Sequence, residues 1–77
     1  MTRLVGRRVT VSVDSSGNPC RVADRAAEPL MSWMVEQDWW SRPVIREYWR
    51  VLLGGSLLAE IYKDHLEEAW YLERIYD

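Results

Sequence analysis

The chain has 77 residues, of which 48% are hydrophobic and 29% are charged, and its formal net charge is −2. This length allows one small domain over residues 1–77, and the composition excludes a disordered chain. The negative net charge argues against an autonomous nucleic-acid-binding protein. A single cysteine, Cys20, excludes a framework of internal disulfides and is typical of a reducing compartment.

The first residues contain no apolar stretch of the kind found in a signal peptide. The central uncharged run over residues 51–59 is much shorter than the roughly 20 residues that a membrane-spanning helix needs. We therefore expect a cytoplasmic protein with no membrane partner.

Aromatic residues are unusually dense, because the chain holds five tryptophans and four tyrosines but no phenylalanine. Each of these rings is large and carries a polar N–H or O–H group that needs a partner. A domain this small has little interior volume. We therefore expect some of the rings to remain at the surface, where they would contact another molecule.

The first predicted element is a strand over residues 8–13, in which Val9, Val11 and Val13 alternate with polar residues. Residues 14–19 are a dense cluster of turn-forming residues. A returning strand begins at Cys20 and ends near Val22. Residues 23–28 show no apolar periodicity and are predicted to be irregular.

The next segment predicts a short helix from Pro29 to Asp38. Leu30, Trp33 and Met34 follow helical spacing, and proline is well tolerated in a first helical turn. Residues 39–43 form a connector, since the residue before a proline resists the helical conformation.

Three strands are predicted in the remainder of the chain, over residues 45–53, 56–63 and 69–76. Gly54 and Gly55 are typical of a two-residue hairpin turn, in which both central residues have positive φ. A helix over residues 57–77 is an open alternative, because several apolar residues there also share one helical face.

The two-residue turn fixes an expected register in which Leu53 pairs with Ser56, Val51 with Leu58, and Trp49 with Glu60. One face of the hairpin would then carry Trp49, Val51, Leu53, Leu58 and Tyr62, and the other would carry Tyr48, Leu52, Leu57, Ala59 and Ile61. The predicted fold is a β-rich α+β domain. About four antiparallel strands form a twisted sheet or partly open barrel, and the helix Pro29–Asp38 covers it.

The strongest candidate for a binding surface combines aromatic residues with arginines. We expect it to contain seven residues between positions 39 and 50: Trp39, Trp40, Arg42, Arg46, Tyr48, Trp49 and Arg50. Tryptophan, tyrosine and arginine dominate the energetics of protein interfaces. The same residue types also bind single-stranded nucleic acid by stacking and charge.

The number and spacing of the cysteine, histidine and acidic residues do not favour a catalytic or a metal site. Cys20 and His65 are each the only residue of their type, and nothing in the sequence places them together as a nucleophile and base. Asp64, His65, Glu67 and Glu68 are typical of a solvated turn rather than of a zinc site with four converging ligands. We expect a protein with no catalytic residue, no metal and no cofactor.

The chain resembles a small bacterial family, a domain of unknown function of about this size. The resemblance lies in Trp33, in Trp39-Trp40, in the run from Arg46 to Val51, and in the closing Trp-Tyr-Leu-Glu-Arg-Ile-Tyr-Asp of residues 70–77. Genes for this family often lie near Y-family translesion DNA polymerases, and no activity is established for it. This chain lacks the basic aromatic strand pair that the family has after its proline, and has residues 21–28 in its place.

The expected function is that of a non-enzymatic protein-interaction module, whose partner is another protein or a second copy of the chain in a homodimer. The alternative is an accessory protein that contacts single-stranded nucleic acid in DNA repair by a translesion polymerase. The resemblance implies this context, and the steep salt dependence of nucleic-acid binding would separate the two.

Overall fold

The computed structural model describes residues 2–39 and 42–76, and these residues form one antiparallel sheet of seven strands. The strands are β1 (Thr2–Val9), β2 (Val11–Val13), β3 (Pro19–Val22), β4 (Arg25–Trp39), β5 (Arg42–Leu53), β6 (Leu57–Asp64) and β7 (Ala69–Tyr76). Their order in the sheet is β1-β7-β6-β5-β4-β3-β2. The described residues contain no helix, so the prediction of an α+β fold with about four strands is wrong.

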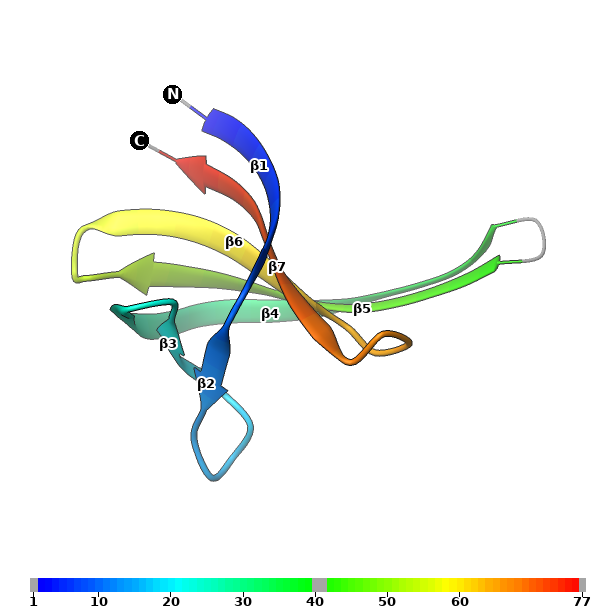
Figure 1. Ribbon diagram of the computed structural model, residues 1–77, viewed down its shortest axis with the longest axis horizontal. Helices are drawn as coiled ribbons and strands as arrows, with labels where there is room; N and C mark the ends of the chain where they lie inside the picture. The colour runs from blue at the N-terminus through cyan, green and yellow to red at the C-terminus, as the bar shows by residue number, and fades with distance from the viewer. Residues whose placement is uncertain (1, 40–41, 77) are drawn as a thin grey trace.

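The sheet curls into a half-barrel because its two edges are adjacent in the chain. β1 lies at one end of the strand order and β2 at the other, yet Thr10 alone separates them. Figure 1 shows β1 and β2 following one another across the body of the sheet. The carbonyl of Thr10 accepts a hydrogen bond from the N–H of Ala23 at 2.8 Å, and this bond joins the bend to the β3–β4 turn.

The core fills the concave side of the curled sheet, here called the inner face. Its fully buried residues include Val51, Ala59 and Ile61, each with 0% exposure, together with Val22 from β3. Residues from both edges of the sheet, including Val9, Val11, Leu72 and Ile75, pack against this cluster. One apolar cluster therefore joins the two ends of the strand order and holds the sheet in its curled shape.

The segment predicted as a helix forms most of β4. From Met31 to Trp39 it pairs residue by residue with β5, and the extra residue Leu30 makes a bulge between Pro29 and Met31. Beyond the bulge the side chains alternate between the two faces, so the helical spacing of Leu30, Trp33 and Met34 does not decide the structure. Long-range pairing overrides the local pattern. Pro29 is compatible with this strand because the edge of β4 that faces away from β5 has no strand partner at this residue.

The strands predicted over residues 45–53, 56–63 and 69–76 are confirmed by β5, β6 and β7, which excludes the alternative helix over 57–77. The segment 23–28, predicted to be irregular, begins with a tight turn and then enters β4. At its start Ala23 adopts a positive φ of 54°.

The expected register of the β5–β6 hairpin is wrong by one residue. Gly54 and Gly55 have the positive φ values that were predicted, 58° and 79°, but the loop also includes Ser56, so Leu53 pairs with Leu57. Val51 then faces Ala59, and Trp49 faces Ile61. A shift of one residue moves every side chain of a strand to the opposite face. As a result Leu57, Ala59 and Ile61 enter the core, and Tyr62 joins the outer face beside Tyr48.

The hairpin of β4 and β5 continues beyond the rest of the sheet (Figure 1). β6 pairs with β5 only as far as Arg46, so residues 36–39 and 42–45 form a two-stranded extension, here called the arm. Near the base of the arm, the N–H of His65 donates a hydrogen bond to the carbonyl of Ile45 at 2.9 Å, which joins the arm to the β6–β7 turn.

Candidate functional site

Four aromatic rings lie side by side on the convex, or outer, face of the sheet. Trp33 of β4 pairs with Tyr48 of β5, which pairs with Tyr62 of β6, which pairs with Tyr71 of β7. The successive ring centroids are 5.5, 5.1 and 5.2 Å apart, close to the spacing of neighbouring strands. The Trp33–Tyr48 and Tyr62–Tyr71 pairs are stacked, with interplanar angles of 4° and 19°. We call these four rings the aromatic row.

Arginine side chains extend over the aromatic row. The guanidinium carbon of Arg46 lies 4.5 Å from the centre of the Tyr62 ring, a cation–π geometry. Its Nη1 also donates a hydrogen bond to the hydroxyl of Tyr48 at 3.3 Å, and this bond raises the pKa of Arg46. Arg50 lies between two rings, 5.9 Å from Trp33 and 5.5 Å from Tyr76.

A buried carboxylate orders the other end of this surface. Glu60 is only 6% exposed although it belongs to the outer face, because long side chains cover it. It accepts a hydrogen bond from Nη2 of Arg50 at 3.0 Å, lies 3.9 Å from Nε of Arg74, and accepts a further hydrogen bond from the hydroxyl of Tyr76. The hydrogen bond to Glu60 raises the pKa of Arg50. This network fixes the rotamers of Arg50 and Tyr76.

Carboxylates also bind the tyrosine hydroxyls of the row. The hydroxyl of Tyr48 donates to Glu73 at 3.4 Å, and that of Tyr71 donates to Glu67 at 3.2 Å. Burial raises the pKa of Tyr62, and burial together with the nearby Glu67 carboxylate raises the pKa of Tyr71. The positive charges of this face are therefore matched by acidic neighbours, and the surface is aromatic and polar without being strongly basic.

The structure describes six of the seven residues of the predicted binding surface, and it divides them among three locations. Arg46, Tyr48 and Arg50 lie together on the outer face. Trp39 and Arg42 pair with each other at the far end of the arm. Trp49 faces the opposite side and packs against the core, and Trp40 lies outside the described residues.

The predicted surface omitted Trp33, Glu60, Tyr62, Tyr71, Arg74 and Tyr76, which complete the outer face. The sequence signal that locates them is alternation in each strand, with Tyr48 and Arg50 in β5 and Glu60 and Tyr62 in β6. The two pairs share a face only when the hairpin loop has three residues instead of two. For Glu60 and Tyr62 the missing information was therefore the length of the loop, whereas Trp33 was missed because its segment was predicted as a helix.

On the inner face, Trp49 and His65 both bind the carboxylate of Glu47. The indole N–H of Trp49 donates to Oε2 at 3.0 Å, and Nε2 of His65 lies 3.0 Å from Oε1. Cys20 is exposed in β3, and its thiol donates to the carbonyl of Ser12. Cys20 and His65 thus have different partners on different strands, and the contacts do not pair them as a nucleophile and a base.

Asp64 organises the β6–β7 turn. Its Oδ1 accepts hydrogen bonds from the N–H groups of Leu66 and Glu67 at 2.9 and 3.1 Å. Burial alone would raise the pKa of Asp64, but these two bonds outweigh it and hold the pKa below its ordinary value. Within residues 2–39 and 42–76, no group of three or more histidine, cysteine or acidic side chains is arranged to hold a metal ion.

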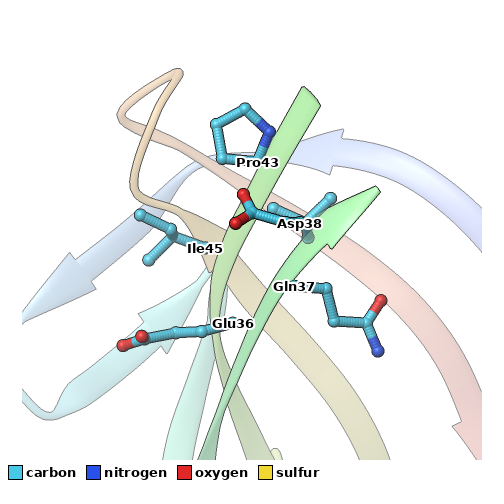
Figure 2. Close-up of a pocket in the computed structure, with 6 residues that line it drawn as sticks. Glu36, Gln37, Asp38, Pro43 and Ile45 are labelled. Carbon is cyan, nitrogen blue, oxygen red and sulfur yellow. The ribbon is translucent and has the colours of Figure 1, made fainter. Parts of the chain in front are cut away.

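The described surface is hollowed in at least two places. One, of about 260 Å³, lies along the arm and is lined by Glu36, Gln37, Asp38, Pro43, Val44 and Ile45. Figure 2 shows that Glu36 and Gln37 point to opposite sides of β4, so the carboxylates and the amide do not converge on one point. The second, of about 270 Å³, lies at the mouth of the half-barrel beside Val22, Leu53, Leu57 and Leu72.

Comparison with protein-family models, with curated proteins and with solved structures finds no match to this chain. The resemblance to the bacterial family encoded near translesion polymerases therefore stays a prediction. In the part of the chain that the structure describes, no helix has the length and apolar character required to cross a membrane.

Proposed function

We propose that this chain is a small, non-enzymatic protein-interaction module in the cytoplasm, and that the outer face of its sheet is the contact surface. The observation that supports this most directly is the ordered array of half-exposed rings and arginines. Trp33, Tyr62, Tyr71, Arg46 and Arg50 are all intermediate in exposure. These residue types contribute most of the binding energy at protein interfaces.

The side chains of this face are held in place before a partner binds. Stacking fixes the rings of the aromatic row, and the Glu60 network fixes Arg50 and Tyr76. Ordering flexible side chains costs about 0.5–1.5 kcal/mol for each long side chain at an interface. A preordered face avoids much of this cost, so a modest contact area can support specific binding.

A protein partner suits this face better than single-stranded nucleic acid does. Bases bind aromatic platforms by stacking on exposed ring faces. In the aromatic row the ring faces of Tyr48 and Tyr62 are covered by neighbouring rings, and Arg46 lies over Tyr62. The carboxylates of Glu60 and Glu73 further reduce the attraction for phosphates.

Affinity capture from a native lysate with two matched variants tests the proposal. Arg46→Gln removes a cation from the outer face but keeps most of the stem, whereas Arg42→Gln makes the same change on the exposed arm. We expect a captured protein that is lost with Arg46→Gln, kept with Arg42→Gln, and unaffected by nuclease or by moderate salt.

Two results would contradict the proposal. One is capture that disappears after nuclease treatment and falls steeply with salt, which would indicate a nucleic-acid ligand. The other is capture that depends on Arg42 but not on Arg46, which would move the contact surface to the end of the arm. Circular dichroism of both variants is the control that tests whether each keeps the wild-type fold.

A further inference from the structure

The outer edge of β4 has no strand partner over most of its length. β3 pairs with β4 only at Arg25 and Ala26, whereas β4 continues to Trp39. Within the described residues, the backbone from residue 27 to residue 39 therefore has hydrogen-bonding groups that face away from β5 without a neighbouring strand. An open edge of this length is a template for pairing with another chain.

The side chains on this edge are apolar and exposed. Leu30, Met31 and Met34 are 50%, 49% and 51% exposed, and they account for three of the six large hydrophobic side chains that are exposed in the described structure. Natural edge strands usually carry charges that prevent pairing. The stretch from Met31 to Val35 carries none, so this edge lacks the usual protection against association.

The sequence of the edge is complementary to itself around Trp33. In an antiparallel pair with its two-fold axis at Trp33, Met31 of one copy lies opposite Val35 of the other, and Ser32 lies opposite Met34. Each pair shares a face, as cross-strand neighbours must. With this axis Glu36 lies opposite Leu30, at the end of the uncharged stretch. An axis at Glu36 would instead oppose two carboxylates at the centre, and an axis at Val35 would place Glu36 next to the axis, opposite Met34.

The aromatic row supports the same axis. The row runs from Tyr71 through Tyr62 and Tyr48 to Trp33, and it ends at Trp33 because β4 has no further strand beside it there. A second β4 strand paired at Trp33 would bring the two indoles together at about the strand spacing of 4.7–4.9 Å. The row would then continue without interruption through both copies.

We propose that two copies of this chain associate through their β4 edges, antiparallel and centred on Trp33, to form one continuous sheet. This inference rests on the proposed function, that the sheet is an interaction module, and it names the partner of the β4 edge as a second copy. The hydrogen bonds of the two backbones and the apolar pairs from Met31 to Val35 hold the dimer together.

Sedimentation equilibrium of the full chain across a dilution series measures the association. We expect a mass of twice 9.1 kDa that dissociates on dilution. Met31→Glu should weaken the association by about a hundredfold, because each copy would lose its apolar pair with Val35 of the other and would place a carboxylate there instead. In the monomer the new carboxylate lies beside Arg50, its neighbour on β5, so folding is preserved.

The matched control is Leu66→Glu, which makes the same change of charge at a similarly exposed residue of the β6–β7 turn. It should leave the association unchanged. A wild-type chain that is monomeric throughout the series would overturn the inference, and so would a dimer that Met31→Glu and Leu66→Glu affect equally.

Cysteine cross-linking tests the register. With Cys20→Ser to remove the native thiol, Met31→Cys combined with Val35→Cys should give a covalent dimer on oxidation, because residues 31 and 35 meet across the axis. Within one chain they are about 13 Å apart along the strand, too far for a disulfide. Neither single variant should cross-link, because each cysteine would then lie opposite a residue without a thiol. Efficient cross-linking by Val35→Cys alone would place the axis at Val35 and refute the proposed centre.

These results are independent of the lysate capture. A monomeric wild-type chain that still captures a protein through Arg46 would refute the dimer and leave the proposed function intact. A dimer that disappears with Met31→Glu, in a chain that captures only nucleic acid, would support the dimer and refute the proposed function of the outer face.

Discussion

Replacing Ile61 by alanine tests the register on which the outer face depends. Ile61 has 0% exposure and packs in the core with Val51, Ala59 and Val22. With a two-residue turn in the β5–β6 hairpin, Ile61 would lie on the opposite face and Leu58 would take the place in the core. In the structure Leu58 is only partly buried and belongs to the outer face.

The expected loss of stability follows from the atoms removed. Isoleucine to alanine deletes three buried carbons, each contributing about 0.8 kcal/mol of transfer free energy, or roughly 2.5 kcal/mol in total. The cavity left behind adds to this, because the surrounding β-sheet backbone cannot collapse freely. We therefore expect the free energy of unfolding to fall by about 3–4 kcal/mol for Ile61→Ala and by about 1–2 kcal/mol for Leu58→Ala.

Urea unfolding followed by tryptophan fluorescence measures both values at a single protein concentration, since association changes apparent stability. If Ile61→Ala no longer unfolds cooperatively, its loss of stability exceeds the expected value of about 3–4 kcal/mol. The milder variant Ile61→Val is then compared with wild type, and its free energy of unfolding should fall by about 0.5–1.5 kcal/mol. A Leu58→Ala variant that loses as much stability as Ile61→Ala would refute the register and the composition of the outer face.

Two further predictions concern ionised groups. Glu60→Gln should lower the free energy of unfolding by about 1–2 kcal/mol, a modest value because solvent screens the partly exposed Arg50 and Arg74. The control Glu68→Gln, whose side chain is 75% exposed, should change the free energy of unfolding by less than about 0.5 kcal/mol. Equal effects in urea unfolding would contradict the buried network. Asp64 has a folded pKa below 3.8, so it stabilises the fold above that pH, and the stabilisation is lost as the pH falls through the folded pKa. The stability deficit of Asp64→Asn should therefore be present near pH 7 and shrink near pH 2; a deficit that is the same at both would refute this role.

Local sequence patterns predicted the strands where apolar and β-branched residues are dense. The aliphatic runs on both sides of Gly54-Gly55 specify extended backbone. The alternation of Val9, Val11 and Val13 predicted one strand over residues 8–13, which is wrong, because the chain bends at Thr10 and β1 and β2 lie at opposite edges of the sheet. The same reasoning predicted a helix over Pro29–Asp38, because a short segment with Leu30, Trp33 and Met34 satisfies helical spacing as well. Only pairing with β5 distinguishes the two, and that pairing is not local.

The residues of the candidate site were also predicted from the sequence only in part. The sequence grouped Arg46, Tyr48 and Arg50 in one contact surface. The structure places these three together on the outer face, where Tyr48 is only 9% exposed. The sequence could not assign Trp49 to the core side or Tyr62 to the outer face, because that assignment depends on one residue in the length of the β5–β6 loop. Glu60 drew no attention in the sequence, since its importance comes from Arg50 of β5 and from Arg74 and Tyr76 of β7, which converge on it from the two neighbouring strands.

The sequence by itself determined that this chain is β-rich and that it carries more aromatic surface than a core of its size can bury. These properties follow from composition and from the two-residue period of a strand, which are present in any short stretch of the chain. Tertiary structure alone decided the seven-strand order, the curling of the sheet through the bend at Thr10, and the face to which each ring belongs. Those features depend on contacts between residues far apart in the chain, where a shift of one residue costs little locally but exchanges the inside of the sheet for its outside.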